Sequence, residues 1–208
     1  RSRYLLIRYR QPSRLSATPV TRSMVAVCPG SSAIRQRMAT IGSSTEPALQ
    51  QAFRARWRSA RERAAHCAVL AQRTGMSLDD AMLGGLLQDI GSLPLLSELE
   101  HWPNVPRESE TLQELCERLS GDLGALVLTR WQLPSAIIES TRLYGQWQRE
   151  HDGAADLADL VLLASALQTS QTLQGPLPAQ VKLGLEQPLG ELRQELAGEL
   201  QLWKRLLA

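Results

Sequence analysis

The residues best placed to do chemistry are Gln88 and Asp89, which stand side by side at the end of the apolar run 81–90. A carboxylate in such a run could bind a metal ion. However, a catalytic metal needs about three protein ligands, and glutamine is a weak, neutral ligand. The alternative is that Asp89, near a helix end, bonds to neighbouring amides or serine hydroxyls. We expect this structural role.

The three histidines are spread along the sequence, away from Asp89. We expect His66, on a long predicted helix, to be packed or half-exposed, and His101 and His151, in polar loops, to be solvated. A nucleophile made from Cys67 and His66 is excluded because adjacent residues of a helix point apart. No serine has the G-x-S-x-G context of a hydrolase. The sequence therefore predicts no catalytic residue, no metal and no cofactor.

Composition predicts that helices position these residues. Hydrophobic residues make up 43% of the 208-residue chain and aromatic residues only 4%, so the core must be built mainly from Leu, Ala, Val and Ile. Leucine and alanine favour helices, whereas the β-branched and aromatic residues that favour strands are scarce. We expect an all-α fold without strands.

The expected helices follow from hydrophobic spacing and from end signals. The longest has apolar residues three or four apart, which makes one buried stripe, and Gly75 ends it. Ser77, followed by two acidic residues, caps the next helix, which runs through the apolar segment that contains Gln88. The expected ranges are 20–27, 31–41, 44–74, 78–90, 109–119, 121–131, 134–148, 154–169, 178–184 and 188–207.

Charge is distributed unevenly. Residues 1–63 carry a net charge of +11 and residues 64–208 a net charge of −9. The basic part could bind nucleic acid through Arg54, Arg56 and Arg58, or it could dock on the acidic remainder. We favour docking, because the basic part lacks a recognition motif. The three cysteines form no disulfide framework, and no apolar run approaches the roughly 20 residues of a membrane span. We therefore expect a cytoplasmic protein with no membrane contact.

Several segments, taken in order, resemble the HDOD domain, the "HD-related output domain" of bacterial signalling proteins. HD hydrolases carry a His-Asp pair on a buried helix, and Gln88-Asp89 stands at that point. The W-x-L-P tetrapeptide at 131–134 is the match to which we give most weight. The matching segments are Pro19-Val20-Thr21, Trp57-Arg58-Ser59-Ala60, Asp80 to Leu95, Gly124-Ala125-Leu126, Trp131-Gln132-Leu133-Pro134, Leu160–Leu167, Leu177-Pro178 and Leu183-Gly184-Leu185.

The chain departs from this family at the positions where metal ligands are found in HD hydrolases. By resemblance, the first histidine falls at or next to Ser59, and the histidine of the His-Asp pair is Gln88. The other vestigial positions are Ser120, the Tyr144-Gly145 pair, which replaces a frequent His-His, and Ser165, which replaces the late aspartate. Only Asp89 is retained, and one carboxylate does not make a catalytic metal site.

Together these observations predict a basic N-terminal helical segment over residues 1–43, which corresponds to an incomplete HDOD N-terminal part, followed by an HD-like helical core over residues 44–208. The resemblance implies a non-catalytic regulatory or scaffolding module of bacterial signal transduction that acts through protein partners. The alternative is a nucleic-acid-binding module that uses the arginine-rich first third of the chain.

Overall fold

The computed structural model describes residues 46–99, 101, 104, 107–169, 173 and 175–207. The helices expected at 20–27 and 31–41, and the boundary expected after residue 43, lie outside these residues. The described part is built from helices and contains no strand, which confirms the expected all-α fold. None of the helices in this part is both long and apolar enough to cross a bilayer.

The longest helix, α3 (Pro47–Thr74), begins and ends where the sequence predicts, to within a few residues. Proline is tolerated at its first position because the amides of the first turn have no partner within the helix. Gly75 adopts a left-handed conformation with φ of 70°, and its amide donates to the Ala71 carbonyl. The second half of α3 is almost fully buried, so this helix forms the centre of the fold.

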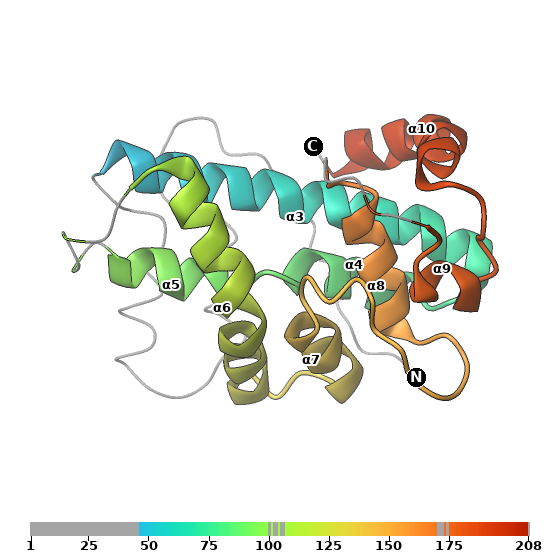
Figure 1. Ribbon diagram of the computed structural model, residues 1–208, viewed down its shortest axis with the longest axis horizontal. Helices are drawn as coiled ribbons and strands as arrows, with labels where there is room; N and C mark the ends of the chain where they lie inside the picture. Colours follow the sequence, from blue (N-terminus) through green and yellow to red (C-terminus); the bar gives the residue numbers. More distant parts are fainter. Residues whose placement is uncertain are drawn as a thin grey trace.

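Two short helices follow α3 and return along it: α4 (Leu78–Leu87) and α5 (Ser92–Leu99). The predicted cap of α4 is confirmed, because the Ser77 hydroxyl accepts a hydrogen bond of 3.3 Å from the Asp80 amide. Figure 1 shows α4 and α5 one after the other alongside α3. The turn between them carries Gln88 and Asp89 into the interior.

Helix α6 (Ser109–Arg130) is continuous, so the prediction of two helices at 109–119 and 121–131 was wrong. Two glycines within this helix, Gly121 and Gly124, have a packing role. A Cβ atom at Gly121 would lie 2.6 Å from the Arg142 carbonyl oxygen, and one at Gly124 would lie 2.6 Å from Thr141 Cγ2. They therefore allow α7 (Ser135–Arg142) to approach α6 closely. Helix α7 is also shorter than the predicted range 134–148.

The chain ends with α8 (Leu157–Ala166), α9 (Pro178–Lys182) and α10 (Leu189–Leu206). All residues of α8 are buried. It is shorter than the predicted 154–169 because a capping box between Asp156 and Asp159 fixes its first turn. Helix α10 lies along α3, and there Arg73 pairs with Glu199 at 2.7 Å.

Two groups of buried apolar residues hold this arrangement together. The larger group joins α8 and the second half of α3 to α4, α7 and α10, and partly buried Trp131 and Leu133 pack against it. The smaller group joins the first turns of α3 to α5 and α6 through Leu49, Phe53 and Leu112. Figure 1 shows α5 and α6 at one end of α3, and α8, α9 and α10 toward the other. Asp89 follows α4, between these two ends.

Candidate functional site

A buried polar cluster forms where four segments meet: α3, α4 with the turn after it, the turn after α7, and the end of α8. We call it the Arg63 cluster. Hydrogen bonds, an ion pair and a cation–ring contact link six of its members: Ser59, Arg63, Gly85, Asp89, Tyr144 and Gln168. The other two, Gln88 and Ser165, bond to each other beside them, since Gln88 precedes Asp89 in the chain. Four of the vestigial positions, together with Asp89, therefore come together in space.

The centre of the cluster is the guanidinium group of Arg63. Its Nη1 lies 3.1 Å from Asp89 Oδ1, and the two side chains are only 2% and 4% exposed. Nη1 also donates to the Gly85 carbonyl at 3.3 Å, and Nη2 donates to Ser59 Oγ at 3.2 Å. The Tyr144 ring centre lies 5.9 Å from the guanidinium carbon, within the range of a cation–π contact. Arg63 is thus a buried cation with a carboxylate partner.

Helical spacing and one glycine produce this arrangement. Ser59 and Arg63 are four residues apart on α3, and residues four apart lie on the same face of a helix. Gly85 lets α4 approach that face, because a Cβ atom there would lie 2.6 Å from Cys67 Sγ and 3.2 Å from the Ala64 backbone. This close contact places the Gly85 carbonyl and Asp89 opposite Arg63.

Gln88 is completely buried and links α4 to α8. Its Oε1 accepts a hydrogen bond from the Ser165 hydroxyl. A second link runs from α8 to α3, because Gln168 Nε2 donates to the Ser59 carbonyl at 3.1 Å. Neutral groups therefore pair with one another at positions where HD hydrolases carry metal ligands.

Tyr144 closes the cluster next to Arg63. Burial raises the pKa of its phenol, and the nearby Asp89 carboxylate raises it further, so the phenol stays neutral. The Tyr144 hydroxyl lies 3.5 Å from Arg56 Nη1.

The two remaining vestigial positions lie outside the cluster. Gly145, the neighbour of Tyr144, is exposed, with φ of 77°, and takes no part in it. Ser120 is buried, and its carbonyl lies against Gly91, two residues after Asp89.

These residues do not fit a catalytic metal. The donors at the vestigial positions are an amide, hydroxyls and a phenol, and the one carboxylate already faces a guanidinium. Four buried side-chain atoms of Arg63 and of these positions have no hydrogen-bond partner among the described residues: Arg63 Nε, Gln88 Nε2, Asp89 Oδ2 and Ser120 Oγ. Imidazole or several carboxylates would be required for a divalent transition metal. The arrangement makes hydrogen bonds, but it offers no complete set of metal ligands.

Sequence reasoning missed Arg63, although a signal for it exists. Arg63 lies three residues after Ala60 and four before Cys67, on the apolar stripe of the long helix. A charge on a buried stripe requires a partner. The single acidic residue in the buried run 81–90 is Asp89, which is therefore a candidate partner, although spacing alone does not show that the two helices face each other.

The histidines lie outside the Arg63 cluster. His66 is buried as expected, and burial lowers its pKa. His101 is exposed, which was also expected. His151 was expected to be solvated, and this was wrong: it is partly buried, and its Nε2 lies 2.9 Å from Asp159 Oδ2. The prediction failed because its partner comes from the following helix, α8.

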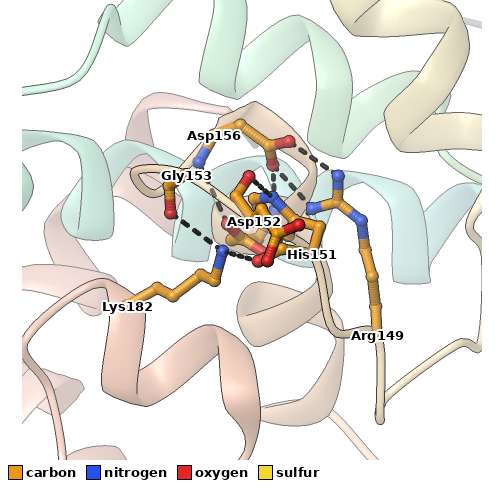
Figure 2. Close-up of polar contacts among 7 residues, drawn as sticks. Arg149, His151, Asp152, Gly153, Asp156 and Lys182 are labelled. Carbon is orange, nitrogen blue, oxygen red and sulfur yellow. Dashed lines mark hydrogen bonds and ion pairs between the residues drawn. The ribbon is translucent and has the colours of Figure 1, made fainter.

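His151 belongs to a second polar cluster at the start of α8, shown in Figure 2. Ligand atoms of His151, Asp156 and Asp159 lie within 4.8 Å of one another. Arg149 already forms ion pairs with both carboxylates, at 2.7 Å from Asp156 Oδ2 and 2.9 Å from Asp159 Oδ1. Lys182 donates to the carbonyls of His151 and Gly153 (Figure 2). The cluster therefore ties the loop before α8 to α8 and α9.

The three arginines predicted as possible nucleic-acid contacts lie on the first half of α3. Arg54 and Arg58 are exposed, whereas Arg56 is partly buried beside Tyr144. Arg54 and Arg58 are therefore more open to a partner than Arg56 is. Their role in binding stays a prediction.

Comparison with known proteins gives matches of two kinds. Among solved structures, a protein assigned as a metal-dependent phosphohydrolase from Shewanella amazonensis SB2B is 19% identical, with a TM-score of 0.63; the match covers 83% of this chain and 68% of that one. A second protein of that organism, assigned as a phosphohydrolase, is also 19% identical, with a TM-score of 0.47, over 84% of this chain and 71% of that one. At this identity the first match shows the fold alone.

Comparison with curated proteins gives no match. The sequence model of the HDOD domain matches residues 32–146, more than half of the chain. The chain belongs to the HDOD domain family, within the HD superfamily.

Proposed function

We propose that this chain is a non-catalytic regulatory or scaffolding module of bacterial signal transduction that acts through protein partners. The observation that supports this most directly is the buried ion pair between Arg63 and Asp89. An HD hydrolase needs a metal that activates water at this place. Here the one retained carboxylate is paired with a side-chain cation.

The two cysteines in the described part of the chain do not offer a nucleophile for hydrolysis. Burial raises the pKa of Cys67 to about 12 and that of Cys116 to about 11, so neither thiol forms the thiolate that a nucleophile requires. The two described surface hollows lie elsewhere. One is lined by residues of α3 and α6, the other by residues of α7 and the start of α8, and neither is lined by Arg63 or Asp89.

The phosphohydrolase assignment of the structural neighbours describes those proteins. Its transfer to this chain would require the metal ligands, and the vestigial positions carry Ser59, Gln88 and Ser165 instead. Family membership with a degenerate site favours a role in which the helical fold itself is recognised. Protein partners are the proposal that follows.

A hydrolase assay tests the non-catalytic part. The purified full chain is incubated with Mn²⁺, Fe²⁺, Zn²⁺ or Ni²⁺ and with phosphomonoesters or cyclic dinucleotides. We expect turnover at background, and Gln88→His alone should not raise it, because the other ligands remain absent. Metal-dependent turnover that disappears in Asp89→Asn would contradict the proposal.

A binding assay tests the partner part. The proteins encoded next to this chain are the first candidates, and the binding of each to the purified chain is measured by calorimetry. A saturable complex with a signalling protein is expected. A chain that turns over a phosphoester and binds none of these proteins would point to an enzyme instead.

A further inference from the structure

We propose that Arg63 is the resident cation of this degenerate HD site: its guanidinium takes the place beside Asp89 that a metal ion would hold, and it keeps divalent metals out even where the lost ligands are restored. The inference goes beyond the loss of ligands, because it names a residue that actively closes the site. It does not depend on which partner the chain binds.

The contacts of Arg63 support this role. Its guanidinium is held by Asp89 and by Ser59, and by resemblance these are the aspartate and first-histidine positions of the metal site. Tyr144, at the position of another frequent histidine, lies over the same group. Gln88 and Ser165, at two further ligand positions, bond to each other in the same buried region. A positive charge therefore contacts three of the former ligand positions directly, at Ser59, Asp89 and Tyr144.

Electrostatics explains why a metal would be excluded. An arginine stays protonated at every pH at which a protein is folded. A divalent cation that bound Asp89 would meet this charge at short range in a poorly screened interior, where repulsion is strong. Arg63 is 2% exposed and lies on the buried part of α3, so its charge is shielded from water.

The unsatisfied polar atoms also indicate a converted site. Buried side-chain polar atoms are almost always paired, yet Arg63 Nε, Gln88 Nε2 and Asp89 Oδ2 have no partner among the described residues. An interior optimised for packing would have replaced these groups by apolar ones. Their presence fits a pocket built for a charged ligand, in which the Arg63 guanidinium now pairs with only some of the buried polar groups.

The test restores the ligands and varies only the arginine. The full chain carrying Ser59→His, Gln88→His and Ser165→Asp is compared with the same chain carrying Arg63→Ala in addition. A matched control adds Arg58→Ala, which removes an exposed arginine of the same helix. Mn²⁺ or Zn²⁺ binding is measured by equilibrium dialysis and elemental analysis, and folding is checked by circular dichroism.

We expect about one metal per chain with Arg63→Ala and none in the restored chain or the Arg58→Ala control. Equal metal binding with and without Arg63 would overturn the inference. A folded Arg63→Ala chain that binds no metal would also overturn it, because ligand geometry and not the arginine would then exclude the ion.

A second measurement covers the case in which the Arg63→Ala chain fails to fold. The melting temperatures of Arg63→Met, Asp89→Asn and the double variant are compared in the otherwise native chain. If the two charges hold each other in place, the double variant melts above at least one of the single variants. A double variant whose loss equals the sum of the two single losses would contradict the assigned pairing.

Discussion

The Ser165 hydroxyl donates to Gln88 Oε1 in the interior of the protein, across a sequence separation of 77 residues. By resemblance, these two positions hold an aspartate and a histidine in HD hydrolases. The bond that replaces them joins α8 to the end of α4 and needs no ion. Loss of the ligands has therefore left a link between the same helices, made by neutral side chains.

The Arg63–Asp89 pair is expected to be essential for stability. Arg63→Met should cost about 3–5 kcal/mol, because it leaves the Asp89 charge buried without a partner. Arg58→Ala, on an exposed position of the same helix, should change the free energy of unfolding by less than about 0.5 kcal/mol. Urea denaturation of the three chains checks this. Equal effects of the two substitutions would show that Arg63 is solvated.

Gly85 is expected to be required for the contact between α3 and α4. Gly85→Ala should destabilise by about 1–3 kcal/mol, since its Cβ would lie 2.6 Å from Cys67 Sγ. Gly198→Ala on α10 is the control: nothing lies within 4 Å of its added Cβ, and it should stabilise the helix by roughly 0.5–1 kcal/mol. A stabilising Gly85→Ala would mean that α4 stands further from α3.

His66 should make stability depend on pH. Burial lowers its pKa below 6.5, so the unfolded chain binds the proton more tightly than the folded chain. Its neutral form therefore contributes fully above pH 6.5, and stability is lost as the pH falls from that value toward the lowered, folded pKa. Urea unfolding of the native chain and of His66→Gln is measured over this range. The stability of the native chain relative to His66→Gln should fall with the pH, and a constant difference would refute the burial effect.

Nucleic-acid binding should be weak. We expect no complex with DNA or RNA tighter than about 10 μM at physiological salt, because non-specific contact alone gives affinities of this order. Fluorescence anisotropy at two salt concentrations measures it. Submicromolar binding with a steep salt dependence, abolished by charge reversal at Arg54, Arg56 and Arg58, would favour the nucleic-acid alternative over the signalling module.

Local signals in the sequence predicted much of the fold. Ser77 and Gly75 have cap functions that depend only on near neighbours, and both were placed correctly. A break was predicted at residue 120, but α6 continues through Gly121 and Gly124, whose role is set by contact with α7. Whether a glycine interrupts a helix or packs against another helix is decided by tertiary structure.

The site could be predicted only in part. The resemblance identified Ser59, Gln88, Asp89 and Ser165, and these residues meet in the Arg63 cluster. The pairing of Arg63 with Asp89 depends on how two helices face each other, and the contact of His151 with α8 depends on the path of a loop. Neither follows from spacing along one element.

The metal content of the native chain tests the central claim most directly. Protein purified without chelator is analysed for Fe, Mn, Zn and Ni, and the measurement is repeated after incubation with each metal and desalting. Because Arg63 occupies the place beside Asp89, we predict no stoichiometric metal bound at Asp89. One metal per chain that is lost in Asp89→Asn, with the variant still folded, would contradict the account.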